Sequence, residues 1–322
     1  MEYTTLGSTG LRVSQLCFGT WRFGMDSDGT TETTRDEAHD LLDAAWENGV
    51  NFIDTANVYG DPPGTSEEWI GEWLAERDRE DVVLASKVYF SVGDRPNDQG
   101  AGRKHVRAQI EGTLDRLGTD YLDVYYVHRW DDETPIEETL RTLNDLVCEG
   151  KVHHLGISNT AAWQLTKALW TSDVEGLERF EITQPRFNAA FREAPAEFLD
   201  VCADQDLAVC PYSPLEAGLL TGKYERGEGF PEGTRGDLVD WDPDERFSDR
   251  QWAVLDAVRS VADETGATPA QVAIGWLVGQ TEFTCVPIVG ARTPAQLEEN
   301  VGGAELSLTD EQVERIDDAY GE

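Results

Sequence analysis

The chain has few lysines, no long apolar run and no paired spacing among its cysteines. Its five cysteines lie far apart in a sequence of 322 residues, and the start lacks the basic and apolar segments of a secretory signal. We therefore expect small buried thiols, with no disulfide and no bound metal. The longest apolar runs, such as residues 272–278, are too short to cross a bilayer. These absences predict a cytoplasmic protein without a membrane partner.

Basic residues are scarce: 26 Lys and Arg stand against 63 Asp and Glu, a formal net charge of −37. Such a surface repels a phosphate backbone, so nucleic acid is not an expected partner. An acidic docking surface and a nucleic-acid mimic remain alternatives, but the acids are spread along the chain instead of gathering in one tail. Concentrated salt screens like charges to within about 3 Å at 1 M. We therefore interpret the chain as adapted to a high-salt cytosol, with a halophilic archaeon as its source.

No Ser-, Gly- or Pro-rich linker divides the chain, and no G-x-G-x-x-G fingerprint follows its first predicted strand. The apolar fraction of 39%, with 10 Trp, 11 Phe and 9 Tyr, is sufficient for one large core. Barrels of alternating strands and helices often exceed 200 residues as one unit. We predict a single domain over residues 1–322 and rank an open dinucleotide-binding sheet second.

Short apolar runs alternate with helical patterns along most of the chain. Strands are predicted at residues 15–18, 51–54, 82–87, 121–127, 152–157, 181–184, 208–212 and 285–288. Helices are predicted at 36–48, 67–77, 104–117, 136–148, 161–170, 195–204, 248–265, 269–279 and 294–301. This alternation predicts a closed (β/α)8 TIM barrel. A β-hairpin at residues 3–13 precedes it, and a helix within 307–319, with a capping box at Thr309 and Gln312, is expected to close across it.

Four reactive side chains stand at the ends of predicted strands: Asp54, Tyr59, Lys87 and His128. Active sites of such barrels lie at the carboxyl ends of the strands. Reduction of a carbonyl by hydride needs a proton for its oxygen, and Tyr59 is the candidate general acid. Lys87, held by Asp54, can lower the phenol's pKa, while His128 can donate to the substrate oxygen. Taken singly, each residue has a structural alternative, such as a helix cap for Asp54.

The string GVNFIDTANVYG followed by SKVYF, together with the order of these residues, resembles the aldo-keto reductase superfamily over nearly the whole chain. The likeness is greatest to the branch that holds general stress reductases and potassium channel β subunits. It implies NADP(H)-dependent reduction of aldehydes or ketones, or oxidation of the matching alcohols or sugars. The alternative is a non-catalytic nicotinamide-binding sensor, against which His128 argues because the channel-associated members carry an amide there. The expected partner is a small carbonyl or sugar substrate, and the expected state is a monomer or weak homo-oligomer.

The resemblance also implies the cofactor contacts. They are Gly19, Thr20, Trp21, Asp54, Ser158, Asn159, Gln184, Tyr212, Ser213, Pro214, Leu215, Gly218, Lys223, Gly290, Arg292, Gln296, Glu299 and Asn300. Residues 158, 159 and 184 would bond the nicotinamide carboxamide, with helix capping as the alternative for the first two. Residue 212 would stack on the ring, residues 213–223 would embrace the pyrophosphate, and residues 290–300 would hold the adenosine end.

This sequence departs from the family where many members carry lysine, serine and arginine: here stand Gly290, Ala291 and Gln296. Arg292 remains for a 2′-phosphate, so we favour NADP with NAD tolerated. Candidate walls of the substrate pocket, or else residues packed under loops, are Trp21, Tyr89, Phe90, Trp130, Phe187 and Arg192. The acidic segment 225–249 is either a clasp over the cofactor or plain surface.

Overall fold

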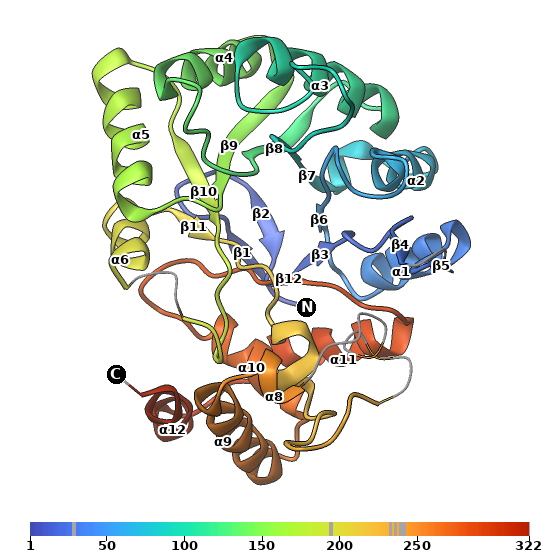
Figure 1. Cartoon of the computed structure of the whole chain (residues 1–322), viewed down its shortest axis with the longest axis vertical. Coiled ribbons are helices and arrows are strands. Elements are labelled where there is room, and N and C mark those ends of the chain that lie inside the picture. The colour runs from blue at the N-terminus through green and yellow to red at the C-terminus, as the bar shows by residue number, and fades with distance from the viewer. Residues whose placement is uncertain (28–29, 193–195, 232–233, 235–236, 238–242, 322) are drawn as a thin grey trace.

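A computed structural model describes residues 1–27, 30–192, 196–231, 234, 237 and 243–321. Its centre is a parallel sheet whose neighbouring strands follow the order β12, β3, β6, β7, β8, β9, β10, β11. Helices surround this sheet on its outer side (Figure 1). The strands are β3 Cys17–Gly19, β6 Phe52–Asp54, β7 Val83–Val88, β8 Leu122–Val127, β9 Val152–Ser158, β10 Phe180–Gln184, β11 Ala208–Val209 and β12 Ile288–Val289. The predicted (β/α)8 barrel is confirmed.

Hydrogen bonds close the barrel between its last two strand segments. The amide of Val209 donates to the carbonyl of Thr284 at 2.8 Å, and the amide of Val286 donates to the carbonyl of Val209 at 2.9 Å. On its other side β12 pairs in parallel with β3. Every strand of the ring therefore has two neighbours, which leaves no open edge.

The predicted N-terminal hairpin is present as β1 Tyr3–Thr5 paired antiparallel with β2 Arg12–Ser14. Leu6 and Val13 are fully buried and belong to the same apolar cluster as the barrel residues Cys17, Phe52 and Val124. The hairpin therefore plugs the barrel with apolar side chains at the end opposite the carboxyl ends of the strands.

The outer layer consists of helices with capping signals in the sequence. Thr268 accepts a hydrogen bond from the amide of Gln271 at the start of α10, and left-handed Gly118 and Gly176 end α3 and α5. The helices are α1 Arg35–Glu47, α2 Thr65–Leu74, α3 Arg103–Leu117, α4 Ile136–Cys148, α5 Ala162–Glu175, α6 Ala196–Asp204, α8 Pro243–Arg246, α9 Asp249–Thr265, α10 Pro269–Val278 and α11 Pro294–Ala304. Short elements complete the list: β4 Asp26–Ser27, β5 Thr30–Thr31, and the 3-10 helices η1 Arg79–Asp81 and η2 Glu216–Thr221.

Two predicted helices differ from the structure by more than three residues at one end or in their placement. Helix α5 continues five residues beyond the predicted end at 170, because its exposed Trp170 and Val174 break the amphipathic pattern on which the prediction rested. The C-terminal helix α12, Asp310–Tyr320, has the predicted Thr309–Gln312 capping box. It packs against α9 at the side of the barrel instead of crossing it (Figure 1). Residue 195, the predicted start of α6, lies outside the described residues.

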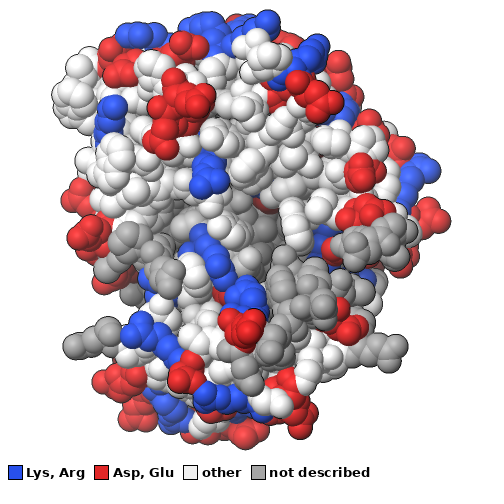
Figure 2. All heavy atoms as spheres, in the orientation of Figure 1, with Lys and Arg blue, Asp and Glu red and all other residues white. Residues whose placement is uncertain are grey.

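Acidic side chains are spread over the helices around the rim in Figure 2, and a hollow opens near the middle of the same face. No helix in the described ranges combines the length and apolar character that a membrane span needs.

Candidate active site

The four predicted catalytic residues meet at the carboxyl ends of neighbouring strands. Asp54 ends β6, Lys87 lies near the end of β7, and His128 directly follows β8. Tyr59 sits in the turn between β6 and α2, where its carbonyl accepts a hydrogen bond from the amide of Ser66 at 3.2 Å. Parallel pairing of β6, β7 and β8 thus brings together side chains that are 74 positions apart in sequence (54 to 128).

Lys87 is the hub of the group and is fully buried. Its Nζ donates to Asp54 Oδ1 at 2.5 Å, to the Thr55 carbonyl at 2.7 Å and to Tyr59 Oη at 3.2 Å. These three acceptors match the three protons of an ammonium group. The side chain is therefore held as a fixed cation against the phenol.

Burial and charge act in opposite directions on this group. Burial acts to lower the pKa of Lys87, but the charges of Asp54 and Tyr59 outweigh it and the pKa is raised. Burial raises the pKa of Asp54 in spite of Lys87, and it also raises the pKa of Tyr59 against the pull of Lys87. The charge of Lys87 does lower the pKa of Tyr59, as predicted. Burial has the larger effect, so the net pKa of Tyr59 is raised. Tyr59 is consequently a neutral phenol that retains its proton.

His128 lies beside the phenol in an apolar setting. Its ring centroid is 5.9 Å from that of Tyr59 and 4.8 Å from that of Phe90, with both pairs close to edge-on. Burial, reinforced by the charge of Lys87, holds the pKa of His128 well below its ordinary value. Its buried Nδ1 has no hydrogen-bond partner within the described part of the chain. The imidazole is therefore neutral and carries a single N–H that it can donate.

A second layer of polar groups fixes Asp54. Gln184 Nε2, from the end of β10, donates to Asp54 Oδ2 at 2.9 Å. The Thr20 hydroxyl donates to the Asp54 carbonyl at 3.0 Å and also lies 2.9 Å from the hydroxyl of Ser66. Both oxygens of the Asp54 carboxylate thus have donors, and its backbone is tied to the neighbouring strand β3.

The predicted carboxamide contacts lie together at the ends of β9 and β10. The Ser158 hydroxyl donates to the carbonyl of Gln184 at 2.7 Å, while Asn159 Nδ2 donates to the carbonyl of His128 at 2.9 Å. Neither caps α5, which starts after Ala161 with Gln164 returning to its amide. The capping alternative is therefore wrong, and these polar groups connect the predicted carboxamide contacts to the backbone of His128.

The next predicted contacts follow β11 in a turn of unusual backbone. The Tyr212 hydroxyl donates to Asn159 Oδ1 at 3.0 Å, which fixes the half-buried ring beside β9. Glu216, Ala217 and Gly218 have consecutive positive φ values of 44°, 53° and 93°. A Cβ at residue 218 would lie 2.8 Å from the Lys223 side chain. The positive φ therefore favours glycine at 218, and a Cβ there would also displace the flexible end of the Lys223 side chain.

Cations gather at the far end of this segment. Lys223 has its pKa lowered by burial and, next, by the charges of Arg292 and Arg22. Arg22 is also ion-paired with Glu32, so its charge is already matched in part by a carboxylate. Arg22 is absent from the predicted contacts, although a cation two residues after the strand-end Thr20 was a usable signal.

The remaining predicted cofactor contacts lie at the ends of β3 and β12, in the loops that follow strands, and on α11. Gln296 Oε1 accepts from the amide of Arg292 at 2.9 Å, and Asn300 Nδ2 donates to the Gly290 carbonyl at 3.4 Å. A Cβ at Gly19 would lie 2.6 Å from Ile288, so the end of β3 needs a glycine to approach β12. Five further predicted contacts differ in burial. Pro214 is buried and Trp21 is exposed, and the half-buried ones are Ser213, Leu215 and Glu299.

Comparison with known proteins agrees with this geometry. The model of the aldo/keto reductase family matches residues 15–321. The chain belongs to the aldo/keto reductase family.

Its relatives within that family have several described roles. The chain is 37% identical to an uncharacterized oxidoreductase, YrpG, of Bacillus subtilis, over 99% of this chain and 96% of the relative. It is 36% identical to norsolorinic acid reductase B of Aspergillus parasiticus, over 97% of this chain and 82% of the relative. It is 35% identical to a probable voltage-gated potassium channel subunit beta of Arabidopsis thaliana, over 95% and 92% respectively.

The predicted pocket residues do not all lie near the catalytic group. Phe90 contacts His128 and is itself packed edge-on by Tyr89 at 5.3 Å, whereas Trp130 packs on Trp163 at 6.1 Å. Phe187 and Arg192 both pack on Trp276, which for Phe187 is the predicted alternative of packing under a loop.

Phe187 is buried against Trp276, with ring centroids 5.4 Å apart. Arg192 places its guanidinium over the same Trp276 ring and pairs with Asp317 of α12 at 2.9 Å. The segment after β10 turns toward the C-terminal helix, so both side chains serve packing of the aldo/keto reductase barrel.

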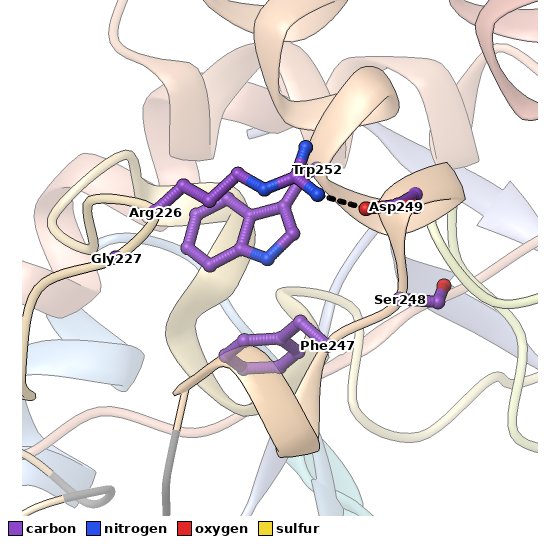
Figure 3. Close-up of a pocket in the computed structure, with 6 residues that line it drawn as sticks. All are labelled: Arg226, Gly227, Phe247, Ser248, Asp249 and Trp252. Atoms are coloured by element: carbon purple, nitrogen blue, oxygen red, sulfur yellow. Dashed lines mark hydrogen bonds and ion pairs between the residues drawn. The ribbon is translucent and has the colours of Figure 1, made fainter.

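A cavity of about 420 Å³ lies elsewhere in the protein. It is lined by Arg226, Gly227, Phe247, Ser248, Asp249 and Trp252 (Figure 3). None of these belongs to the catalytic group. The predicted clasp, segment 225–249, includes residues 232–233, 235–236 and 238–242, which lie outside the described residues.

Proposed function

We propose that this protein is an NADP(H)-dependent reductase of aldehydes or ketones, with the reverse oxidation of alcohols or sugars open to it. The observation that carries the proposal is the contact of Lys87 Nζ with Tyr59 Oη at 3.2 Å, while Asp54 holds the same ammonium at 2.5 Å. Relatives named as reductases support the reaction class.

Each residue has a separate task in this proposal. When bound, the reduced nicotinamide supplies hydride to the carbonyl carbon. Tyr59, a neutral phenol, donates its proton to the carbonyl oxygen. Lys87 stabilises the phenolate left behind, because a fixed ammonium in a buried site costs no reorganisation. Asp54 keeps Lys87 charged, and neutral His128 donates a hydrogen bond that orients the carbonyl.

The residues present fit a nicotinamide dinucleotide. The strand-end amides of Asn159 and Gln184 and the half-buried ring of Tyr212 suit the nicotinamide end. Lys223, whose neighbours include Arg292 and Arg22, suits the phosphates because cations can donate charge-assisted hydrogen bonds to them. We favour NADP over NAD because Arg292 can pair with a 2′-phosphate.

A sensor or regulatory role is the second candidate, since relatives include probable channel β subunits. His128 favours the enzyme, because the complete group of Asp54, Tyr59, Lys87 and His128 is assembled around the proton donor. A sensor would need cofactor binding but no competent proton delivery.

Tyr59→Phe tests the proposal directly. Turnover should fall at least about a hundredfold, the lower range for a general acid. Cofactor binding, followed by quenching of tryptophan fluorescence, should be unchanged. Tyr121→Phe is the matched control because Tyr121 precedes β8 at the opposite end of the strand and stacks on His153. Near-normal turnover of Tyr59→Phe would remove Tyr59 from the mechanism.

The surface charge belongs to the same proposal. We assign the net charge of −37 to work in a salt-rich cytoplasm, where counterions screen the repulsion between dispersed acids. Support comes from the ion pairs that cover the helices, such as Arg103 with Asp145 at 2.7 Å and Arg107 with Glu149 at 2.9 Å. Even with such pairs, acids remain in large excess.

A further inference from the structure

Helix α5 exposes large apolar side chains in a single row. Trp163, Trp170 and Val174 are 63%, 64% and 65% exposed. Their spacing of seven and four residues places them on one face of the helix, with Thr166 and Lys167 between them. These five residues are called the α5 stripe below. The opposite face of the helix, with Leu165, Ala168 and Leu169, is buried against the barrel.

The α5 stripe is a departure from the rest of the surface. Only two other large apolar side chains, at positions 3 and 21, are counted as exposed among the described residues, and neither lies on a helix. Tryptophan on an open helix face is a marker of protein contact, because its large area gains most from losing water. In Figure 2 uncharged side chains project from the edge of the molecule where Figure 1 places α5.

Charge distinguishes the same face. Helix α1 carries five acidic residues in 13 positions, whereas α5 carries two in 14. Both are ion-paired with arginines beside the helix: Asp173 with Arg179 at 3.1 Å, and Glu175 with Arg141. The α5 stripe therefore presents a lysine and apolar groups without an unopposed carboxylate.

We propose that the α5 stripe is the contact surface of a homodimer. Two molecules of net charge −37 repel each other over most orientations, so an acid-poor face is where two copies can meet. Antiparallel packing of two α5 helices about a two-fold axis places Trp163 opposite the partner's Val174. The same packing sets Lys167 over the ring of the partner's Trp170, and the reverse holds across the axis. The stripe is thus complementary to itself, which a contact with an unrelated acidic protein would not require.

Association should depend on salt in a characteristic direction. Screening removes the repulsion between the two anionic bodies, and salt also strengthens apolar contact. Raising KCl from about 0.5 M to 3 M should therefore lower the dimer's Kd. A dimer held by ion pairs would weaken over the same range.

Sedimentation velocity of the full chain over this salt series is the test. Wild type should show a reversible dimer that tightens with salt. Trp170→Ser should raise Kd at least about thirtyfold, the scale of a tryptophan hot spot. Reductase turnover should not change, because Trp170 is remote from the catalytic group in the fold, on the outer face of α5.

Lys167→Glu is a second variant that leaves the helix packing intact. It should weaken the dimer, while Lys104→Glu, a matched exposed lysine on α3, should not. The proposal is overturned if wild type is monomeric throughout, if Trp170→Ser leaves Kd unchanged, or if the two lysine variants behave alike. Binding of monomeric wild type to vesicles of phosphatidylcholine, lost in Trp170→Ser, would also overturn it in favour of a lipid surface.

Discussion

Removing Lys87 should lower both the stability and the turnover of the protein. Lys87→Met leaves the Asp54 carboxylate buried without its cation, and breaking a buried pair in this way costs about 3–5 kcal/mol. A domain of this kind has about 5–15 kcal/mol to lose, so the variant should fold but unfold at lower urea. Turnover should also fall at least about a hundredfold, because the phenolate of Tyr59 loses its fixed cation.

The double variant Asp54→Asn, Lys87→Met should recover much of the lost stability. Burial raises the pKa of Asp54 even with Lys87 beside it, so the buried carboxylate is strongly unfavourable once its cation is removed. Removal of both charges is therefore expected to be much less costly than the sum of the single changes, with a coupling of about 2–3 kcal/mol. An asparagine at 54 can still accept the hydrogen bond of Gln184. Turnover should stay low, since the cation is still missing.

Urea unfolding followed by circular dichroism measures these differences without changing ionic strength, and steady-state rates measure the chemistry. Additive losses of stability would show that Asp54 and Lys87 are not coupled. Recovery of turnover in the double variant would refute electrostatic stabilisation of Tyr59 by Lys87.

Three further predictions concern the cofactor, the pH response and the salt response. Arg292→Ala should raise the KM for NADPH about tenfold or more, the effect of a hydrogen bond to a charged group, and leave the KM for NADH unchanged. Gly290→Lys should lower the KM for NADPH, and there is room for the side chain because a Cβ at 290 would meet nothing closer than 3.8 Å. Equal weakening of both cofactors by Arg292→Ala would mean that the guanidinium stacks on adenine. The pKa of His128 is depressed in the folded protein, so as pH falls the imidazole is protonated in the unfolded chain first. The free energy of unfolding should therefore fall as pH drops below about 6.5. Urea titration should show a smaller fall in His128→Asn. Thermal melts from about 0.1 M to 3 M KCl should rise steadily, whereas a flat series would assign the acidity another purpose.

Most of the fold could be predicted from the sequence because the barrel repeats one simple rule. Each strand is a short apolar run and several of the following helices have a capping signal, so Val83–Val88 and Leu122–Val127 are found within one residue of their predicted starts. Positions after β10 could not be predicted in the same way. Phe187 and Arg192 follow a strand end, but long-range contact with Trp276 and Asp317 decides their direction.

The residues of the candidate site could be predicted from the sequence, but the pKa shifts within the site could not. Strand ends identified Asp54, Tyr59, Lys87 and His128, because parallel pairing brings such positions together. The sign of the pKa shift at Tyr59 depends on how completely the phenol is buried, and no local pattern reports this. The proximity of Arg22 to Lys223 was not predicted, because the two residues are far apart along the chain.

The same limit applies to the polar network that supports the catalytic group. Ser66, at the start of α2, places its hydroxyl 2.9 Å from that of Thr20 and 3.0 Å from that of Thr55. The Thr55 carbonyl in turn accepts from Lys87 at 2.7 Å. A buried chain of hydroxyls therefore joins β3, β6 and α2 to the ammonium that faces Tyr59. In a buried setting each hydroxyl must find a partner, so the positions of all three are mutually determined. The geometry of proton delivery is thus a property of the whole strand-end face, built from residues that individually carry no catalytic signature.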